Sequence, residues 1–137
     1  MPGDPSADTL SDNAKSYTAA ASCLMSNGDL DTALAPAFYL LTGFALELFL
    51  KAVCMRGGAS SGELVALGHD LHKAYTRAMK TGMVPQVMTP LGSLVLALND
   101  QHRTHVFRYT PDVPQLIVPP PGHCIDVLNE AITVNFP

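Results

Sequence analysis

The sequence has no tryptophan, only three cysteines and few charged residues. Charged residues occupy 15% of its 137 positions, against about 25% in typical soluble domains. The cysteines are too few and too scattered for a disulfide framework or a paired-cysteine zinc site, so we expect a reducing, cytoplasmic setting. Hydrophobic residues make up 47% of the chain. That share excludes a disordered protein and predicts a compact domain with a sizeable core.

The chain also lacks a basic excess. Its formal net charge is −4 and its isoelectric point is about 5.6, which excludes a generically basic nucleic-acid coat protein. The charge is unevenly distributed, however, because residues 51–108 carry seven basic and three acidic side chains. If the helices of this middle segment lie side by side, one face of the protein is positive despite the net charge.

No signal peptide is expected, because the first twelve residues contain three aspartates and no early basic cluster. One long apolar stretch, Ala33 to Cys54, resembles a membrane span in length, but it contains Glu47 and Lys51. Each charge would cost about 2.5–3.5 kcal/mol at a bilayer centre. We therefore interpret the stretch as the buried central helix of a soluble bundle and expect no membrane association.

Apolar residues recur at helical spacing along most of the chain, and no segment alternates convincingly as a strand does. We expect an all-α, up-and-down bundle of four to five helices, with a proline-rich connector over 109–122 before the last helix. Residues 1–10 are expected to form a flexible tail and residues 11–137 a single domain. The expected helices run from Ser11 or Asp12 to Asn27, from Asp31 or Thr32 to Arg56, from Asp70 to Lys80, from Thr89-Pro90 onward, and from His123 to Val134, with a possible short turn at Glu63–Leu67.

Glu47 and Lys51 interrupt the apolar central helix four residues apart, with the acid first, which favours a helical ion pair. Gly43 lies on the same narrow stripe, so a neighbouring element can approach closely there. The favoured interpretation is a partly buried structural ion pair that fixes the packing of adjacent helices. The alternative is that the pair lines a functional site together with His69 and Arg108.

Three short motifs resemble those of HEPN-like domains, small helical bundles of prokaryotes. Ala45–Ala52 (ALELFLKA) resembles their "ELxLKA" helix, Gly68–Leu71 (GHDL) resembles the start of the following helix, and His105–Tyr109 (HVFRY) resembles a late "HxxxRY" segment. The resemblance covers about Asp31 to Tyr109. It implies a helical bundle that forms homodimers and binds nucleotide or RNA, sometimes as a toxin with a partner such as a nucleotidyltransferase or an antitoxin.

Many such domains are metal-independent ribonucleases with an Arg-x4–6-His motif, and this chain departs from that pattern. Neither His102 nor His105 has an arginine at the required distance upstream, and Arg103 lies only two residues before His105. We therefore expect a non-catalytic nucleotide-binding, RNA-binding or protein-interaction module. The alternative is a ribonuclease in which His105 or His102 acts as general acid or base and Arg108 holds the phosphate.

Polar side chains near the three motifs are the candidates for contact with a phosphate. Two His-x-x-His pairs, His69–His72 and His102–His105, could also converge on one metal ion, but we expect no metal and no cofactor, because single histidines on helices are more often surface or core-edge residues. The candidate phosphate contacts are Lys51, His69, His102, Arg103, Arg108 and Tyr109.

Overall fold

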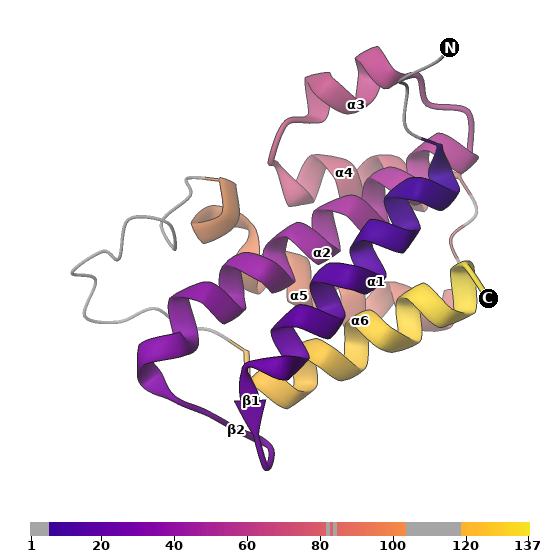
Figure 1. The fold of residues 1–137 in the computed structure, drawn as a ribbon. Coiled ribbons are helices and arrows are strands. Elements are labelled where there is room, and N and C mark those ends of the chain that lie inside the picture. The colour runs from indigo at the N-terminus through magenta and orange to yellow at the C-terminus, as the bar shows by residue number, and fades with distance from the viewer. Residues whose placement is uncertain (1–5, 82, 84, 104–118) are drawn as a thin grey trace.

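The computed structural model describes residues 6–81, 83, 85–103 and 119–137 (Figure 1). Within these residues the chain is an all-α helical bundle with one tiny antiparallel hairpin, which confirms the expected fold class. The elements are α1 (Ala7–Cys23), β1 (Met25–Ser26), β2 (Asp29–Leu30), the 3₁₀ turn η1 (Thr32–Leu34), α2 (Ala35–Arg56), α3 (Ser61–Leu67), α4 (Leu71–Met79), α5 (Pro85–Arg103) and α6 (Pro121–Asn135).

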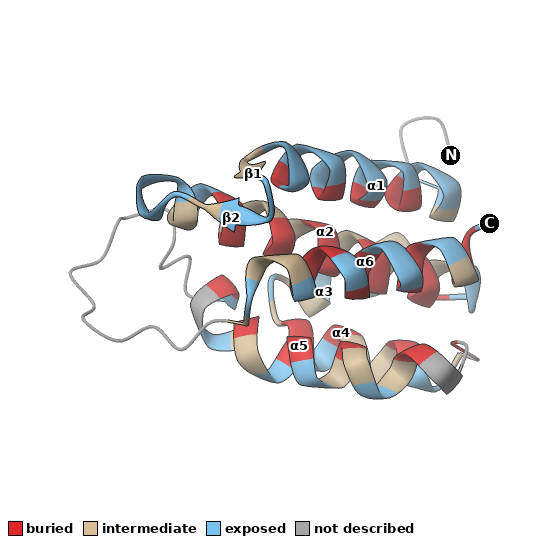
Figure 2. Ribbon diagram, turned by 90° about the horizontal axis from the view of Figure 1, so that it is seen from below, coloured by how far each residue is buried: buried red, intermediate tan, exposed pale blue. Residues whose placement is uncertain are grey.

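Helix α2 is the centre of the bundle and contacts α1, α4, α5 and α6. Buried residues lie along the facing sides of the helices, and exposed residues cover the outside (Figure 2). Phe38, Leu46, Phe49 and Leu50 of α2 are all fully buried. Residues Thr32–Arg56 are long and apolar enough to cross a membrane, the one such helix among the described residues. Its packing within the bundle fits the core helix of a soluble protein.

The ends of α2 and α6 are joined by Arg56, the last residue of α2. Its guanidinium group donates a hydrogen bond to the carbonyl of Asn135 and lies 4.4 Å from the centroid of the Phe136 ring. Cation–π contacts of this kind add to the attraction between the two elements. They hold the C-terminal end of α6 against the C-terminal end of α2.

The first helix begins earlier than expected. It starts at Ala7, and the side chain of Ser6 caps it by accepting a hydrogen bond from the backbone N–H of Thr9. Leu10 is buried in the core, so the tail expected over residues 1–10 does not extend through this turn. Ser11, which with Asp12 was one of two expected helix starts, is instead a buried helical residue whose hydroxyl donates to the carbonyl of Asp8.

The boundaries of α2 and α4 agree more closely with the sequence, whereas the start of α5 does not. Helix α2 ends at Arg56 as expected, with Asp31 capping the preceding turn. Helix α4 follows Asp70, whose side chain accepts from the N–H of Lys73. Helix α5 begins before the expected Thr89-Pro90 start, so Pro90 lies inside it.

A two-residue hairpin replaces the simple helix stop that was expected at Asn27-Gly28. Met25 pairs with Leu30 and Ser26 pairs with Asp29. Both turn residues have positive φ, 52° at Asn27 and 81° at Gly28. An Asn-Gly dipeptide favours this tight hairpin turn because both residues tolerate the left-handed backbone conformation.

Candidate functional site

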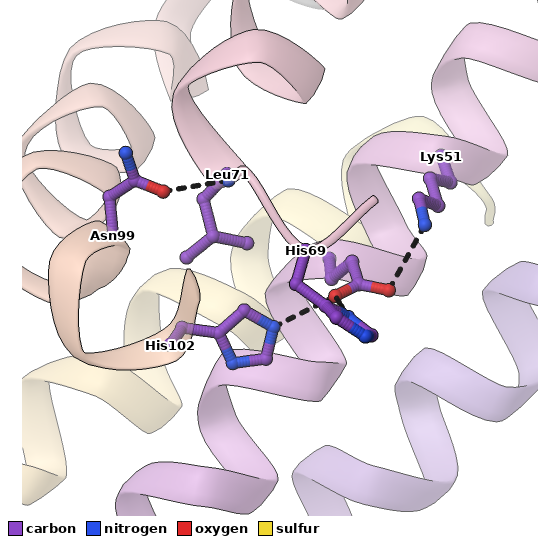
Figure 3. Close-up of polar contacts among 6 residues, drawn as sticks. Lys51, His69, Leu71, Asn99 and His102 are labelled. Carbon is purple, nitrogen blue, oxygen red and sulfur yellow. Dashed lines mark hydrogen bonds and ion pairs between the residues drawn. The ribbon is translucent and has the colours of Figure 1, made fainter. Parts of the chain in front are cut away.

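The most concentrated group of polar side chains surrounds the carboxylate of Glu47 in the middle of α2. His69 Nδ1 lies 2.7 Å and His102 Nε2 2.8 Å from Glu47 Oε1, while Lys51 Nζ lies 3.1 Å from Glu47 Oε2 (Figure 3). We call Glu47, Lys51, His69 and His102 the carboxylate junction. It joins α2, the loop between α3 and α4, and α5 at one point.

Glu47 stays ionised in the junction although its side chain is only 7% exposed. Burial alone would raise the pKa of this carboxyl group, but hydrogen bonds from His102 and His69 and the charge of Lys51 lower it to about 2. Three hydrogen-bond donors offset the free-energy cost of burying this carboxylate, because each donor replaces a lost contact with water. The carboxylate of Glu47 is thus an ionised, fully bonded centre of the junction at neutral pH, while His102 Nδ1 is buried without a hydrogen-bond partner among the described residues.

Local sequence features bring His69 to the junction. Gly68 ends α3 with a φ of 57°, a left-handed conformation that glycine adopts at little cost. The next helix is then held at its start by two side chains: Asp70 caps α4, and Asn99 Oδ1 of α5 accepts from the N–H of Leu71 at 2.8 Å. His69, between the turn and the cap, is directed at Glu47 as a consequence.

His102 reaches Glu47 because Gly43 leaves room for it. A Cβ atom built on Gly43 would lie 2.4 Å from His102 Nδ1, so no larger residue fits without a shift. The approach predicted at Gly43 is therefore confirmed, and α5 is the element that approaches. Phe44 packs edge-on against both His69 and His102, with ring centroids 6.0 and 5.0 Å apart.

The structure brings three of the sequence candidates to Glu47. The predicted ion pair between Glu47 and Lys51 is present. The side chain of His69 is 44% exposed, whereas that of His102 is 1% exposed. A phosphate contact by His102 would therefore require its bond with Glu47 to open.

The remaining sequence candidates do not join the junction in the described residues. Arg103 lies at the end of α5 with its side chain 52% exposed, 3.6 Å from Asp100. His105, Arg108 and Tyr109 lie outside the residues that the structure describes, and so does most of the proline-rich connector. Their proposed roles stay predictions.

Sequence reasoning did not connect His102 with Glu47, and it overlooked Phe44. The one signal was the Gly43–Glu47–Lys51 stripe, which marked a close approach without naming the neighbour. The packing of the helices decides which side chain lies against Gly43. The periodicity of apolar residues predicts each helix but does not predict which helices pack together.

A second polar feature is the outer side of α4. Lys73 and Lys80 are exposed there, and Arg77 lies between them, 3.3 Å from Glu63. We call Lys73, Arg77 and Lys80 the cationic face. These residues line a shallow cavity of about 400 Å³ together with Leu67, His72 and Thr76. Helices α4 and α5 pack against one another, as required for a positive face built from the middle segment.

No protein-family model, curated protein or solved structure matches the chain.

Proposed function

We propose that this chain is a non-catalytic, HEPN-like RNA-binding domain of the cytoplasm that contacts phosphates through the cationic face. The supporting observation is the cavity on α4 bordered by Lys73, Arg77 and Lys80. Lysine and arginine side chains attract phosphates and release condensed counterions when they bind them. Free nucleotides offer the same phosphate chemistry, but a row of cations along an open helix face suits a strand better than a single nucleotide.

The buried junction supports a non-catalytic function. A general acid or base must reach the proton that it transfers, either directly or through one water. His102 is fully buried and bonded to Glu47, so of the two histidines in the ribonuclease alternative it is the less suited. That alternative rests on His105 together with Arg108.

A homodimer is part of the proposal, and an exposed apolar side chain supports it. Leu96 of α5 is 77% exposed. It borders a small cavity that is lined mostly by apolar atoms and includes Tyr75, Met79 and Gly92. Burial of such a side chain against a second copy would be favourable, by about 1.5–3 kcal/mol for a leucine. A nucleotidyltransferase or antitoxin partner could use the same surface.

The RNA proposal is tested by fluorescence anisotropy with a labelled single-stranded RNA of about 16 nucleotides, the upper end of common site sizes. We expect binding whose affinity falls with salt. Lys73→Ala and Lys80→Ala should each weaken binding and reduce the slope of log K against log salt by about 0.7. Lys15→Ala is the matched control, because Lys15 is also exposed but lies on α1.

Equal effects of all three alanine variants, or no binding by the folded wild type at low salt, would contradict the proposal. The same RNA run on a denaturing gel after incubation should stay intact. Cleavage that disappears in His105→Ala would instead establish the ribonuclease alternative.

Sedimentation of the wild type and Leu96→Glu tests the homodimer. The homodimer proposal predicts that only the wild type associates.

A further inference from the structure

The carboxylate junction offers three metal-ligand atoms at one point. Glu47 Oε1, His69 Nδ1 and His102 Nε2 all lie within 4.8 Å of one another. Two imidazoles and one carboxylate form the donor set of three-ligand zinc sites, which leave a fourth position for water. We propose that Glu47, His69 and His102 bind one divalent transition-metal ion of the zinc class. This inference goes beyond the RNA-binding function and does not depend on it.

The distances between Glu47 Oε1 and the two ligand nitrogens need only a small change. Zinc lies about 2.0–2.2 Å from nitrogen and oxygen ligands, which places tetrahedral ligands about 3.3 Å apart. The two N–O distances in the junction are 2.7 and 2.8 Å, so each must lengthen by about half an ångström. The side chain of His69 is 44% exposed and precedes α4. An adjustment of this size at His69 shifts its edge-on contact with Phe44.

The carboxylate is already prepared as a ligand. Its Oε1 atom already faces both ligand nitrogens, His69 Nδ1 at 2.7 Å and His102 Nε2 at 2.8 Å. Lys51 holds the second oxygen, Oε2, at 3.1 Å. That bond orients the carboxylate and leaves Oε1 for the ion, as outer partners of metal ligands commonly do.

The site also has access to solvent. Glu47 and Lys51 border a cavity of about 360 Å³, and the side chain of His69 is 44% exposed. An ion can therefore approach the junction through the exposed imidazole of His69.

A missing hydrogen bond at His102 limits the affinity of the site for a metal ion. When Nε2 of His102 becomes a ligand, the ring proton moves to Nδ1, and Nδ1 is buried without a hydrogen-bond partner in the described part of the chain. Ligating histidines usually donate this proton to an acceptor, and loss of such a partner weakens metal binding about 10–100-fold. We therefore expect weaker binding than in structural zinc sites.

This proposal differs from the expectation of no metal, and from the idea that each His-x-x-His pair would act as a unit. Of the three histidines of these pairs that the structure describes, His69 and His102 reach the junction, and His105 lies outside the described residues. His72 is exposed on the outer side of α4 and lines the cavity of the cationic face instead. The pair His69 and His72 thus contains a proposed ligand and a matched control three residues apart.

The test is isothermal titration of the tag-free chain with zinc chloride, after removal of bound metal with a chelator. The wild type should bind one zinc ion per chain. His69→Gln should bind at least about tenfold more weakly, because it lacks one of three ligands, whereas His72→Gln should stay within about twofold of the wild type. Circular dichroism checks that both variants are folded.

A second measurement separates specific from general binding. Zinc should raise the melting temperature of the wild type and His72→Gln, because an ion that binds the folded state stabilises it, and it should not raise that of His69→Gln. Equal zinc affinity in the two histidine variants, or no zinc binding by the wild type, would overturn the proposal. RNA binding is measured separately in chelator, so failure of one proposal is distinguishable from failure of the other.

Discussion

Replacement of Glu47 by glutamine removes the charge of the carboxylate junction and keeps the size of the side chain. The amide has one acceptor oxygen, whereas the carboxylate accepts from His69, His102 and Lys51. The NH₂ group of the glutamine side chain must also face one of these donors, and two donors cannot form a hydrogen bond with each other. At least one charge-assisted hydrogen bond is then lost, and such bonds contribute about 1.5–3 kcal/mol each.

The lowered pKa of Glu47 gives a second estimate of the unfolding free energy that Glu47→Gln loses. The group titrates at about 2 in the folded protein, against an ordinary value of 4.5. That difference corresponds to about 3 kcal/mol at ~1.4 kcal/mol per pH unit. Because the side chain is 7% exposed, solvent screening reduces this figure little. We expect Glu47→Gln to lower the free energy of unfolding by about 3 kcal/mol.

The assay is urea unfolding at neutral pH, followed by circular dichroism and repeated from pH 6 down to pH 2. Since the folded pKa is lowered, the stabilisation is present above pH 4.5 and is lost as the pH falls towards 2. The stability gap between the wild type and Glu47→Gln should therefore close over that interval. Glu130→Gln is the control, because Glu130 is exposed on α6 and its loss should change stability by under about 0.5 kcal/mol. A Glu47→Gln effect equal to that of the control would refute the account of the junction.

Two further predictions concern close packing and thiol reactivity. Gly43→Ala should destabilise the protein by about 1–3 kcal/mol, measured by the same urea assay, because its Cβ would lie 2.4 Å from His102 Nδ1; an unchanged unfolding midpoint would contradict this contact. Cys23 is exposed, whereas Cys54 and Cys124 are buried and burial raises the pKa of both, to about 12 for Cys124. A thiol reagent should therefore label one cysteine in the native protein and three after denaturation; rapid native labelling of Cys124 would contradict the packing of α6.

Much of the bundle could be predicted because helix periodicity and caps are local properties. The end of α2 at Arg56 and the start of α4 next to Asp70 are examples. The failures are also local. Asn27-Gly28 is a hairpin signal as well as a helix stop, and Pro90 is accommodated inside α5 although proline usually marks a first turn.

The candidate site could be predicted only where its residues share one helix. Glu47 and Lys51 lie four apart on α2, so their ion pair follows from helix geometry. The bonds from His69 and His102 span 22 and 55 positions of sequence. They depend on how α2, α4 and α5 pack, which is set by the whole core rather than by any local pattern.

The most direct test of the proposed function is an NMR titration of the isotope-labelled protein with single-stranded RNA. RNA binding at the cationic face predicts that the backbone amides of Lys73, Arg77 and Lys80 shift on addition of RNA, while the amide of Lys15 on α1 does not. Shifts confined to α1, or no shifts in α4 at an RNA concentration that saturates binding, would contradict the assignment of RNA binding to this face.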